Sequence, residues 1–143
     1  TIWAMNNSEI TFEDLQTRIH NFVEKAKEAK QDIGFNFTIE ESLKTSKFGS
    51  IEGMNIYRTI QEAVNNSIKY AEASRINNEI KSLDNAISIL IQDNGSGFDS
   101  ALINPGNGLL NMKKRVADID GNLSIESVLS KGTRISIVIP KKE

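Results

Sequence analysis

Two segments with the alternating apolar and polar residues of β-strands, 74–83 and 86–93, are separated only by Asp84 and Asn85. Asp and Asn favour a tight hairpin turn, so the two segments are expected to pair as antiparallel strands. A second pair of strands with a short connection is expected near the C-terminus. Strands joined in this way exclude a doubly wound nucleotide-binding fold, in which a helix separates successive strands.

The rest of the chain combines helical and strand periodicity. Thr11 and Asp14 form a variant of the capping box at the start of the first helix, and Gly34 ends that helix. Residues 44–53 are polar and contain glycine, which indicates a connection. The predicted helices cover 11–31, 55–71 and 109–119, and the other predicted strands cover 35–39, 122–128 and 133–139. We expect an α+β domain, a two-layer sandwich in which helices pack on one face of a mixed sheet of about five strands.

Length and composition restrict the class of protein further. The chain has 143 residues, which fit one domain able to bury a core without disulfides. It has no cysteine and one histidine, which excludes thiolate chemistry, Cys-ligated zinc and a multi-histidine metal site. A net charge of -2 argues against a nucleic-acid partner. Since neither a membrane span nor a signal peptide is apparent, the expected location is the cytoplasm, with a membrane anchor allowed for in a longer parent protein.

The predicted helix 55–71 carries polar residues that a purely structural helix does not favour. Residues 65–67 are Asn, Asn and Ser, which are poor helix formers in mid-helix. The apolar face of this helix is predicted to comprise Ile56, Ile60, Ala63, Val64, Ser67 and Ala71. Glu62, Asn66 and Lys69 cluster on the opposite side. One interpretation is an ordinary solvated face. The other is a site for magnesium and nucleotide phosphates, which bind carboxylate or amide oxygens and an ammonium group.

A glycine-containing loop, residues 93–98, follows an Ile-rich strand. Asn94 and Gly95 are a hairpin signal, but residues 99–108 supply no return strand. A calcium loop is disfavoured because glycines occupy positions where oxygen ligands belong. The glycines instead allow the backbone to approach a ligand, and Asp93 can accept a hydrogen bond from an exocyclic amine.

A second glycine-containing loop, residues 106–109, opens the last predicted helix. Glycines there leave backbone N–H groups free at the positive end of a helix, which favours phosphate binding. Lys113, Lys114 and Arg115 follow, and at least two of these three are expected to be a solvated basic face. Neither loop is a Walker A motif.

Taken in order, these segments resemble the GHKL superfamily, which includes gyrase, Hsp90, the histidine kinases and MutL. The matching boxes are the N box at 62–71, the G1 box at 93–98, the G2 box at 106–115 and the closing Gly-Thr at 132–133. The resemblance covers about residues 31–140, and four boxes in the family's order are specific. Residues 108–116, with the short lid between Phe98 and Gly106, are similar to the nitrate-sensor-like class of sensor histidine kinases. The resemblance implies the Bergerat fold and binding of ATP with Mg²⁺.

The resemblance also implies a role for each matching residue. Asn66 would be the magnesium ligand, Lys69 would contact phosphate, and Asp93 would read the adenine amine. Glu62 lies where hydrolytic members of the superfamily keep a general base. The other expected nucleotide contacts are Tyr70, Gly95, Gly97, Phe98, Gly106, Asn107, Gly108, Leu109 and Thr133.

The implied parent protein is a sensor histidine kinase, expected to be a homodimer. It would transfer the γ-phosphoryl of MgATP to a histidine outside this chain and then to a response regulator. Residues 1–30 would hold the end of the dimerisation helix, the linker and a connecting helix, and residues 31–143 the ATP-binding catalytic domain. His20 is followed by Asn21 and not by Asp or Glu, so it departs from the family's phosphoacceptor motif.

Two alternatives remain open on the same fold. One is a serine kinase of the anti-sigma-factor type, which lacks a phosphorylatable histidine by design. The other is a non-catalytic nucleotide-binding module. A gyrase-like ATPase is disfavoured because such domains are longer and carry a larger lid.

Overall fold

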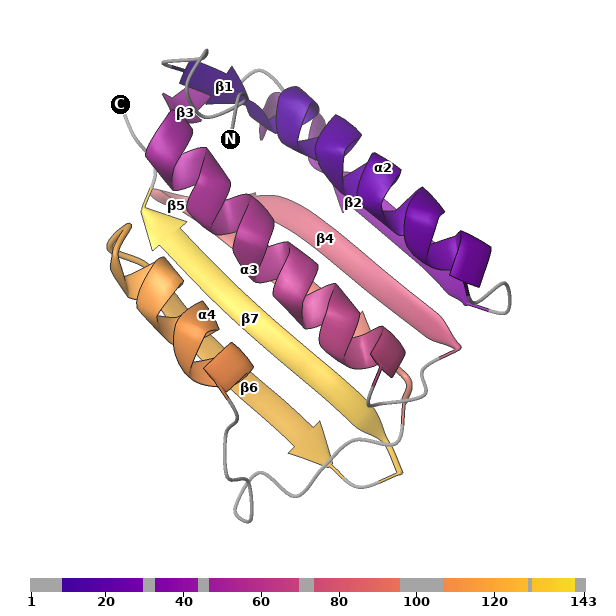
Figure 1. The fold of residues 1–143 in the computed structure, drawn as a ribbon. Coiled ribbons are helices and arrows are strands. Elements are labelled where there is room, and N and C mark those ends of the chain that lie inside the picture. Colours follow the sequence, from indigo (N-terminus) through magenta and orange to yellow (C-terminus); the bar gives the residue numbers. More distant parts are fainter. Residues whose placement is uncertain are drawn as a thin grey trace.

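A five-stranded sheet with helices on one face forms the protein in the computed structural model, which describes residues 9–29, 33–43, 47–69, 74–95, 107–128 and 130–140 (Figure 1). The strands are β1 (Glu9–Thr11), β2 (Gly34–Ile39), β3 (Lys47–Gly49), β4 (Arg75–Leu83), β5 (Ala86–Asp93), β6 (Asn122–Val128) and β7 (Gly132–Pro140). The helices are α2 (Phe12–Ala29), α3 (Ser50–Lys69), α4 (Asn107–Ala117) and the short 3-10 helix η1 (Glu41–Leu43).

The sheet has the strand order β2-β4-β5-β7-β6. The pair β2 and β4 is parallel, and the other neighbouring strands are antiparallel. The helices α2, α3 and α4 lie side by side over one face of this sheet (Figure 1). The expected fold class, a two-layer sandwich with a mixed sheet, is confirmed. The predicted hairpin is also present, with Asp84 at a φ of 48° in the turn between β4 and β5.

The hydrophobic core lies between the helices and the sheet. Alternate residues of the central strands point into it, and Ile76, Ile80 and Ile89 are each at most 1% exposed. Helix α2 contributes Phe12 and Leu15, both completely buried, to the same cluster. Burial of each such side chain stabilises the fold by about 1.5–3 kcal/mol. Helix α2 is therefore an integral part of the domain's core.

The predicted capping box starts α2. The Asp14 backbone N–H donates to Thr11 Oγ1 at 3.2 Å, and the Thr11 backbone N–H donates to Asp14 Oδ2 at 3.0 Å. These reciprocal bonds satisfy backbone donors that the first helical turn cannot satisfy itself. The helix ends at Ala29, and residues 30–32, which belonged to the predicted end of this helix, lie outside the described residues.

The predicted connection at 44–53 is wrong in part. Residues 47–49 form β3, which pairs antiparallel with β1, and α3 begins at Ser50, five residues before the predicted start at Asn55. Gly53 is buried inside this helix although glycine costs about 1 kcal/mol in a helix interior. Packing of the apolar face of α3 on the core offsets that cost.

Helix α4 begins at Asn107, two residues before the predicted start, and ends at Ala117, two residues before the predicted end. The Asp120 N–H donates to Ala117 O at 3.0 Å, and the Gly121 N–H donates to Val116 O at 2.9 Å. These two bonds form a Schellman motif in which Asp120, at a φ of 62°, takes the left-handed position usually held by glycine. Gly121 serves close packing instead, since a Cβ there would lie 2.8 Å from Val116 Cγ1.

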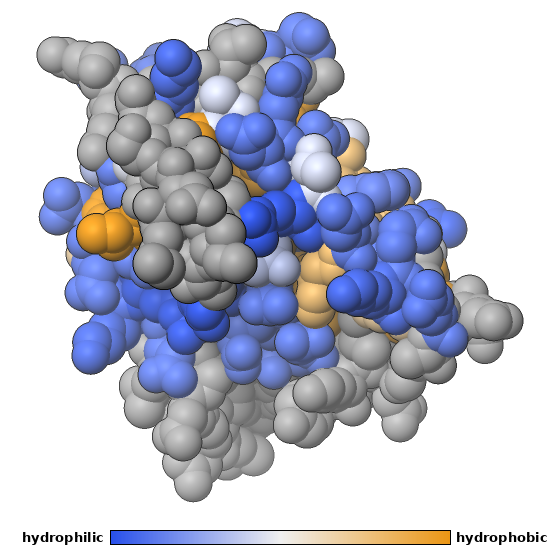
Figure 2. Space-filling view, turned by 45° about the horizontal axis from the view of Figure 1, so that its top comes forward, coloured by the Kyte–Doolittle hydropathy of each residue, from blue (hydrophilic) through white to orange (hydrophobic). Residues whose placement is uncertain are grey.

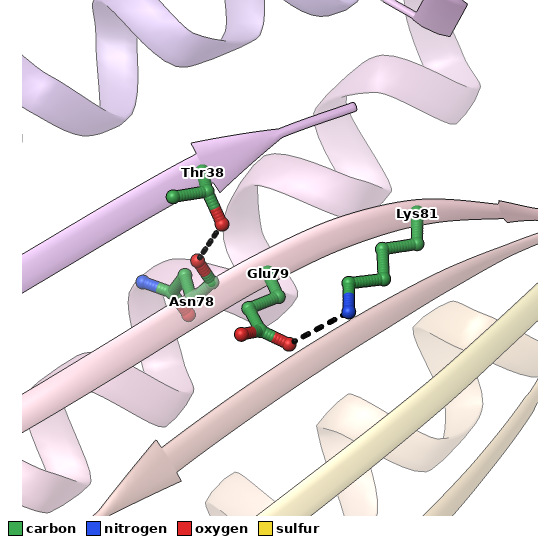
Figure 3. Close-up of polar contacts among 4 residues, drawn as sticks. All are labelled: Thr38, Asn78, Glu79 and Lys81. Atoms are coloured by element: carbon green, nitrogen blue, oxygen red, sulfur yellow. Dashed lines mark hydrogen bonds and ion pairs between the residues drawn. The ribbon is translucent and has the colours of Figure 1, made fainter. Parts of the chain in front are cut away.

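Asn78 interrupts the core-facing row of β4. It is 1% exposed, between the buried Ile76 and Ile80. Its backbone carbonyl accepts a hydrogen bond from Thr38 Oγ1 at 3.4 Å (Figure 3). Within the described residues, its side-chain Oδ1 and Nδ2 have no hydrogen-bond partner. An unsatisfied buried polar group costs about 1–3 kcal/mol, so this amide lowers the stability of the fold.

The face of the sheet opposite the helices is polar. Asn36 Nδ2 donates to Asn77 Oδ1 at 3.0 Å between β2 and β4, and Glu79 and Lys81 form an ion pair at 3.6 Å (Figure 3). On the helix side and top of the molecule, the residues coloured in Figure 2 are mostly hydrophilic, with small separate hydrophobic spots. In the part of the chain that the structure describes, no helix is both long and apolar enough to cross a membrane.

Candidate functional site

Three element ends come together at one end of the molecule. Helix α3 ends there, β5 ends there with Asp93, and β7 begins there, while the start of α4 points toward the same end and lies over β6 (Figure 1). The antiparallel pairing places Asp93 opposite Ile76 on one side and Thr133 on the other. The predicted N box, G1 box and closing Gly-Thr are therefore brought together around the end of β5.

The carboxylate of Asp93 is at the centre of this end and is buried, with 6% exposure. Its Oδ2 accepts a hydrogen bond from Ser67 Oγ of α3 at 2.5 Å. Its Oδ1 accepts hydrogen bonds from the backbone N–H of Gly95 at 2.9 Å and of Thr133 at 3.2 Å. The carboxylate thus links the end of α3, the first glycine loop and the start of β7.

Counting hydrogen bonds from the described residues, these three leave one acceptor site of the Asp93 carboxylate free. A carboxylate has about four lone-pair sites, two on each oxygen. The two backbone N–H groups use both sites of Oδ1, and Ser67 uses one site of Oδ2. The remaining site is on Oδ2. It can accept a hydrogen bond from a ligand amine, whereas a carbonyl oxygen in the same place would be repelled.

Gly132 allows β7 to approach Asp93. Its φ is +99°, and a Cβ at this position would lie 2.1 Å from the backbone oxygen of Asp93. Real Cβ atoms cannot come that close, so the position requires glycine. This contact gives a physical reason for the Gly-Thr pair that the sequence comparison with the superfamily singled out.

Thr133 takes part in a polar network with β6. Its hydroxyl lies 2.9 Å from Ser127 Oγ, which also donates to Gly132 O at 3.3 Å. Ser127 is 8% exposed, so these bonds satisfy a buried hydroxyl. The sequence predicted Thr133 beside the site but missed Ser127, because nothing in a single strand shows which residue lies across from it.

Asn94 holds the glycine loop against the start of β4. Its Oδ1 accepts hydrogen bonds from the backbone N–H groups of Ser74 at 3.0 Å and Arg75 at 2.9 Å, and its Nδ2 donates to Ser74 Oγ at 2.9 Å. Its own N–H donates to Arg75 O at 3.2 Å. The sequence indicated only a turn at Asn94, whereas the structure makes it a clamp between two segments far apart in the chain.

Helix α3 presents two faces at the site. The predicted core face is confirmed by the burial of Ala63, Val64 and Ser67. Glu62 and Asn66, one helical turn apart, are half-buried, and no hydrogen bond to another described residue holds either side chain. Asn66 precedes Ser67 in the helix, and it is Ser67 that contacts the Asp93 carboxylate.

For the remaining predicted site residues, the structure describes either the backbone alone or nothing, except at Gly95. Gly95 is buried and forms the bond to Asp93 given above. Lys69 is the last residue of α3, and Asn107, Gly108 and Leu109 are the first residues of α4, where only the backbone is described. Tyr70, Gly97, Phe98 and Gly106 lie outside the described residues.

Helices α3 and α4 are also joined directly. Asn55 Nδ2 donates to the backbone oxygen of Arg115 at 3.3 Å, and the two helices run side by side in Figure 1. This bond lies near the start of α3 and the end of α4, so the two helices run antiparallel, and the end of α3 and the start of α4 both point toward the end of the molecule that holds Asp93. This arrangement offers a carboxylate for an amine and, next to it, groups suited to phosphate and metal oxygen chemistry.

Comparison with known proteins identifies relatives of the same kind. The sequence pattern of the family described as histidine kinase-, DNA gyrase B-, and HSP90-like ATPase matches residues 52–143. The chain is 36% identical over 89 residues to the signal transduction histidine-protein kinase/phosphatase DegS of Bacillus subtilis, covering 59% of this chain and 23% of the relative. It is 36% identical over 98 residues to DegS of Brevibacillus brevis, covering 68% of this chain and 25% of that relative. The chain thus spans about a quarter of the length of these relatives.

Solved structures share the fold. The mycobacterial sensor histidine kinase MprB superposes with a TM-score of 0.73 at 19% identity, covering 94% of this chain and 97% of that one. The catalytic domain of the histidine kinase ThkA, in a nucleotide-free form, superposes with a TM-score of 0.73 at 18% identity. The match covers 93% of this chain and 94% of that one. At these identities the likeness concerns the fold alone.

Proposed function

Because the chain belongs to the histidine kinase-, DNA gyrase B- and HSP90-like ATPase family, we propose that it is the ATP-binding catalytic domain of a two-component sensor histidine kinase. The single observation that carries the proposal is the acceptor site of Asp93 that no described residue uses, held where α3, β5 and β7 come together. Adenine carries an exocyclic amine that can donate to this acceptor. Guanine carries a carbonyl oxygen at the same position and would meet the carboxylate with a like partial charge.

The phosphates of ATP would lie between α3 and α4. Free backbone N–H groups at the start of a helix bind phosphate oxygens, and Asn107, Gly108 and Leu109 form the start of α4. Gly106 precedes this helix, and Lys69 at the end of α3 would add a positive charge. On the adenine side, the proposed contacts are Gly95 and Thr133, and the resemblance to the family adds Tyr70, Gly97 and Phe98, which lie outside the described residues.

Asn66 fits the role of a magnesium ligand, because its amide is half-buried and is not used by another described residue. The metal would neutralise charge on the phosphate oxygens. Asn66 would orient it through the amide oxygen, and Glu62, one turn earlier on the same face, would assist through its carboxylate. Magnesium accepts such oxygen ligands while keeping several waters.

The phosphoacceptor would lie outside this chain. His20 is exposed on α2, with 69% of its side chain accessible, and its Nε2 is 3.9 Å from Glu24. Its sequence context does not match the family's His-Asp or His-Glu motif. In this proposal residues 1–30 connect a dimerisation domain that carries the reactive histidine to the ATP-binding catalytic domain, 31–143, with α2 of the connecting segment packed into the core of that domain, in a homodimeric kinase in the cytoplasm. A response regulator would then receive the phosphoryl group.

Calorimetric titration of MgATP into the protein tests the nucleotide site. We expect saturable binding, because the proposed site has one acceptor for the adenine amine, on Asp93, and separate groups for the phosphates, at the start of α4. Absence of heat up to about millimolar nucleotide, where binding free energy falls to about 4 kcal/mol, would contradict the proposal.

Phosphotransfer separates the histidine kinase from the serine kinase. The protein is incubated with labelled ATP and the histidine-bearing domain of its parent, and the product is treated with acid. Acid-labile phosphohistidine is expected. Acid-stable phosphoserine would favour the anti-sigma-factor type of kinase, and ATP binding without transfer would favour the non-catalytic module.

A further inference from the structure

Ser67 is a polar residue on the buried face of α3. It is 5% exposed and follows the buried Ala63 and Val64 along the same face. An alanine would fill such a position with better helix propensity and without a polar group to satisfy. Packing alone therefore does not explain the hydroxyl, and its hydrogen bond to Asp93 indicates what it does.

The Ser67 hydroxyl fixes one oxygen of Asp93. The distance from Ser67 Oγ to Asp93 Oδ2 is 2.5 Å, which matches a charge-assisted hydrogen bond from a hydroxyl to a carboxylate. The two backbone donors, Gly95 N–H and Thr133 N–H, both bind the other oxygen, Oδ1. Among the described residues, only Ser67 holds Oδ2 in place, and Oδ2 is the oxygen that carries the open acceptor site.

We propose that Ser67 is a positioning residue for recognition of the nucleobase, which aims the free lone pair of Asp93 Oδ2 at the exocyclic amine of adenine. This inference rests on the proposed ATP site and deepens it. The serine acts through the carboxylate and makes its contribution only when the ligand has an amine to donate. Its effect is therefore a change in base selectivity, not a general loss of nucleotide affinity.

The test compares ATP with purine ribonucleoside triphosphate, a nucleotide that lacks the exocyclic amine and keeps the same sugar and phosphates. Dissociation constants of both are measured with magnesium for the unaltered protein and for Ser67→Ala. The matched control is Thr59→Val. Thr59 is 1% exposed on the same helix, and its hydroxyl donates to Asn55 O at 2.7 Å.

We expect Ser67→Ala to weaken ATP binding about tenfold, in line with loss of one charge-assisted hydrogen bond, and to change binding of the amine-free nucleotide less than about twofold. The preference for ATP, measured as the ratio of the two dissociation constants, decreases accordingly. Thr59→Val keeps the preference of the unaltered protein. Ser67→Cys, with a weaker thiol donor, gives an intermediate preference and serves as the second variant should Ser67→Ala be too unstable to measure.

Several results would overturn the inference. An equal loss of affinity for both nucleotides in Ser67→Ala would show that the serine only supports the fold. An unchanged preference for ATP in the Ala and Cys variants would show that Oδ2 is aimed without it. Failure of the unaltered protein to bind either nucleotide is a different result, because it would contradict the proposed function itself.

Discussion

The backbone carbonyl of Asp93 lies so close to Gly132 that a Cβ on Gly132 would come within 2.1 Å of the carbonyl oxygen. Gly132 also has a φ of +99°, a conformation that other residues rarely adopt. This contact sets the start of β7 beside the end of β5. The next residue, Thr133, can then donate its backbone N–H to the Asp93 carboxylate.

Gly132→Ala should destabilise the protein by about 2–4 kcal/mol, because the new methyl group must displace backbone and the positive φ becomes strained. Denaturant unfolding measures this change. The control is Gly34→Ala, since a Cβ at Gly34 would meet Ser74 O at 3.7 Å, an ordinary contact. Similar stability of the two variants would contradict the close approach of Gly132 to Asp93.

Asn78→Val should raise the stability of the protein by about 1–2 kcal/mol, because it replaces two unsatisfied buried polar atoms with apolar ones. Thermal unfolding would then shift upward by several degrees. The control is Asn77→Val on the opposite face of β4, where Asn77 Oδ1 accepts from Asn36 and no gain is expected. A lower melting temperature for Asn78→Val would mean that the buried amide has a stabilising partner.

Asn94→Ala should weaken both the fold and the nucleotide site. The side chain holds Ser74 and Arg75 by three hydrogen bonds, and its loss should cost about 1–3 kcal/mol. Because the clamp positions the glycine loop next to Asp93, MgATP affinity should fall as well. Unfolding and calorimetric titration measure the two effects, with Asn85→Ala in the exposed turn as control. Full stability of Asn94→Ala would show that the clamp is not needed.

Asn66→Ala should reduce only the part of ATP affinity that depends on magnesium. The expected loss is roughly tenfold with magnesium and little without it, since one oxygen ligand of the metal is removed. The neighbouring Asn65→Ala, a change of the same kind on the same helix, should leave the magnesium dependence as it is. Equal losses with and without magnesium in Asn66→Ala would contradict the assignment of the ligand.

Local sequence patterns predicted much of the fold. The capping box at Thr11 and Asp14 and the hairpin at Asp84 and Asn85 depend on neighbours in the chain, and the structure confirms both. The strand pairing of β1 with β3 was missed because segments of three residues carry too little periodicity and gain their partner only in the folded protein. The start of α3 was missed because Gly53 looked like a loop residue.

The sequence likewise predicted only part of the site. Asp93 and Thr133 are identified by motif, and the structure brings them into contact. The helical periodicity predicts that Ser67 faces the core, and its burial confirms this, but its role depends on the carboxylate opposite. Ser127 and the clamp of Asn94 likewise depend on partners across the fold, which one sequence does not reveal.

The most direct test is the selectivity between MgATP and MgGTP before and after Asp93→Asn, with the exposed Asp118→Asn as control. The unaltered protein should prefer ATP strongly. Asp93→Asn should weaken ATP binding roughly 10- to 100-fold, because an amide replaces an acceptor that is charged, and should remove most of the preference. Equal affinity of the unaltered protein for both nucleotides, or a preference that survives Asp93→Asn, would contradict the account.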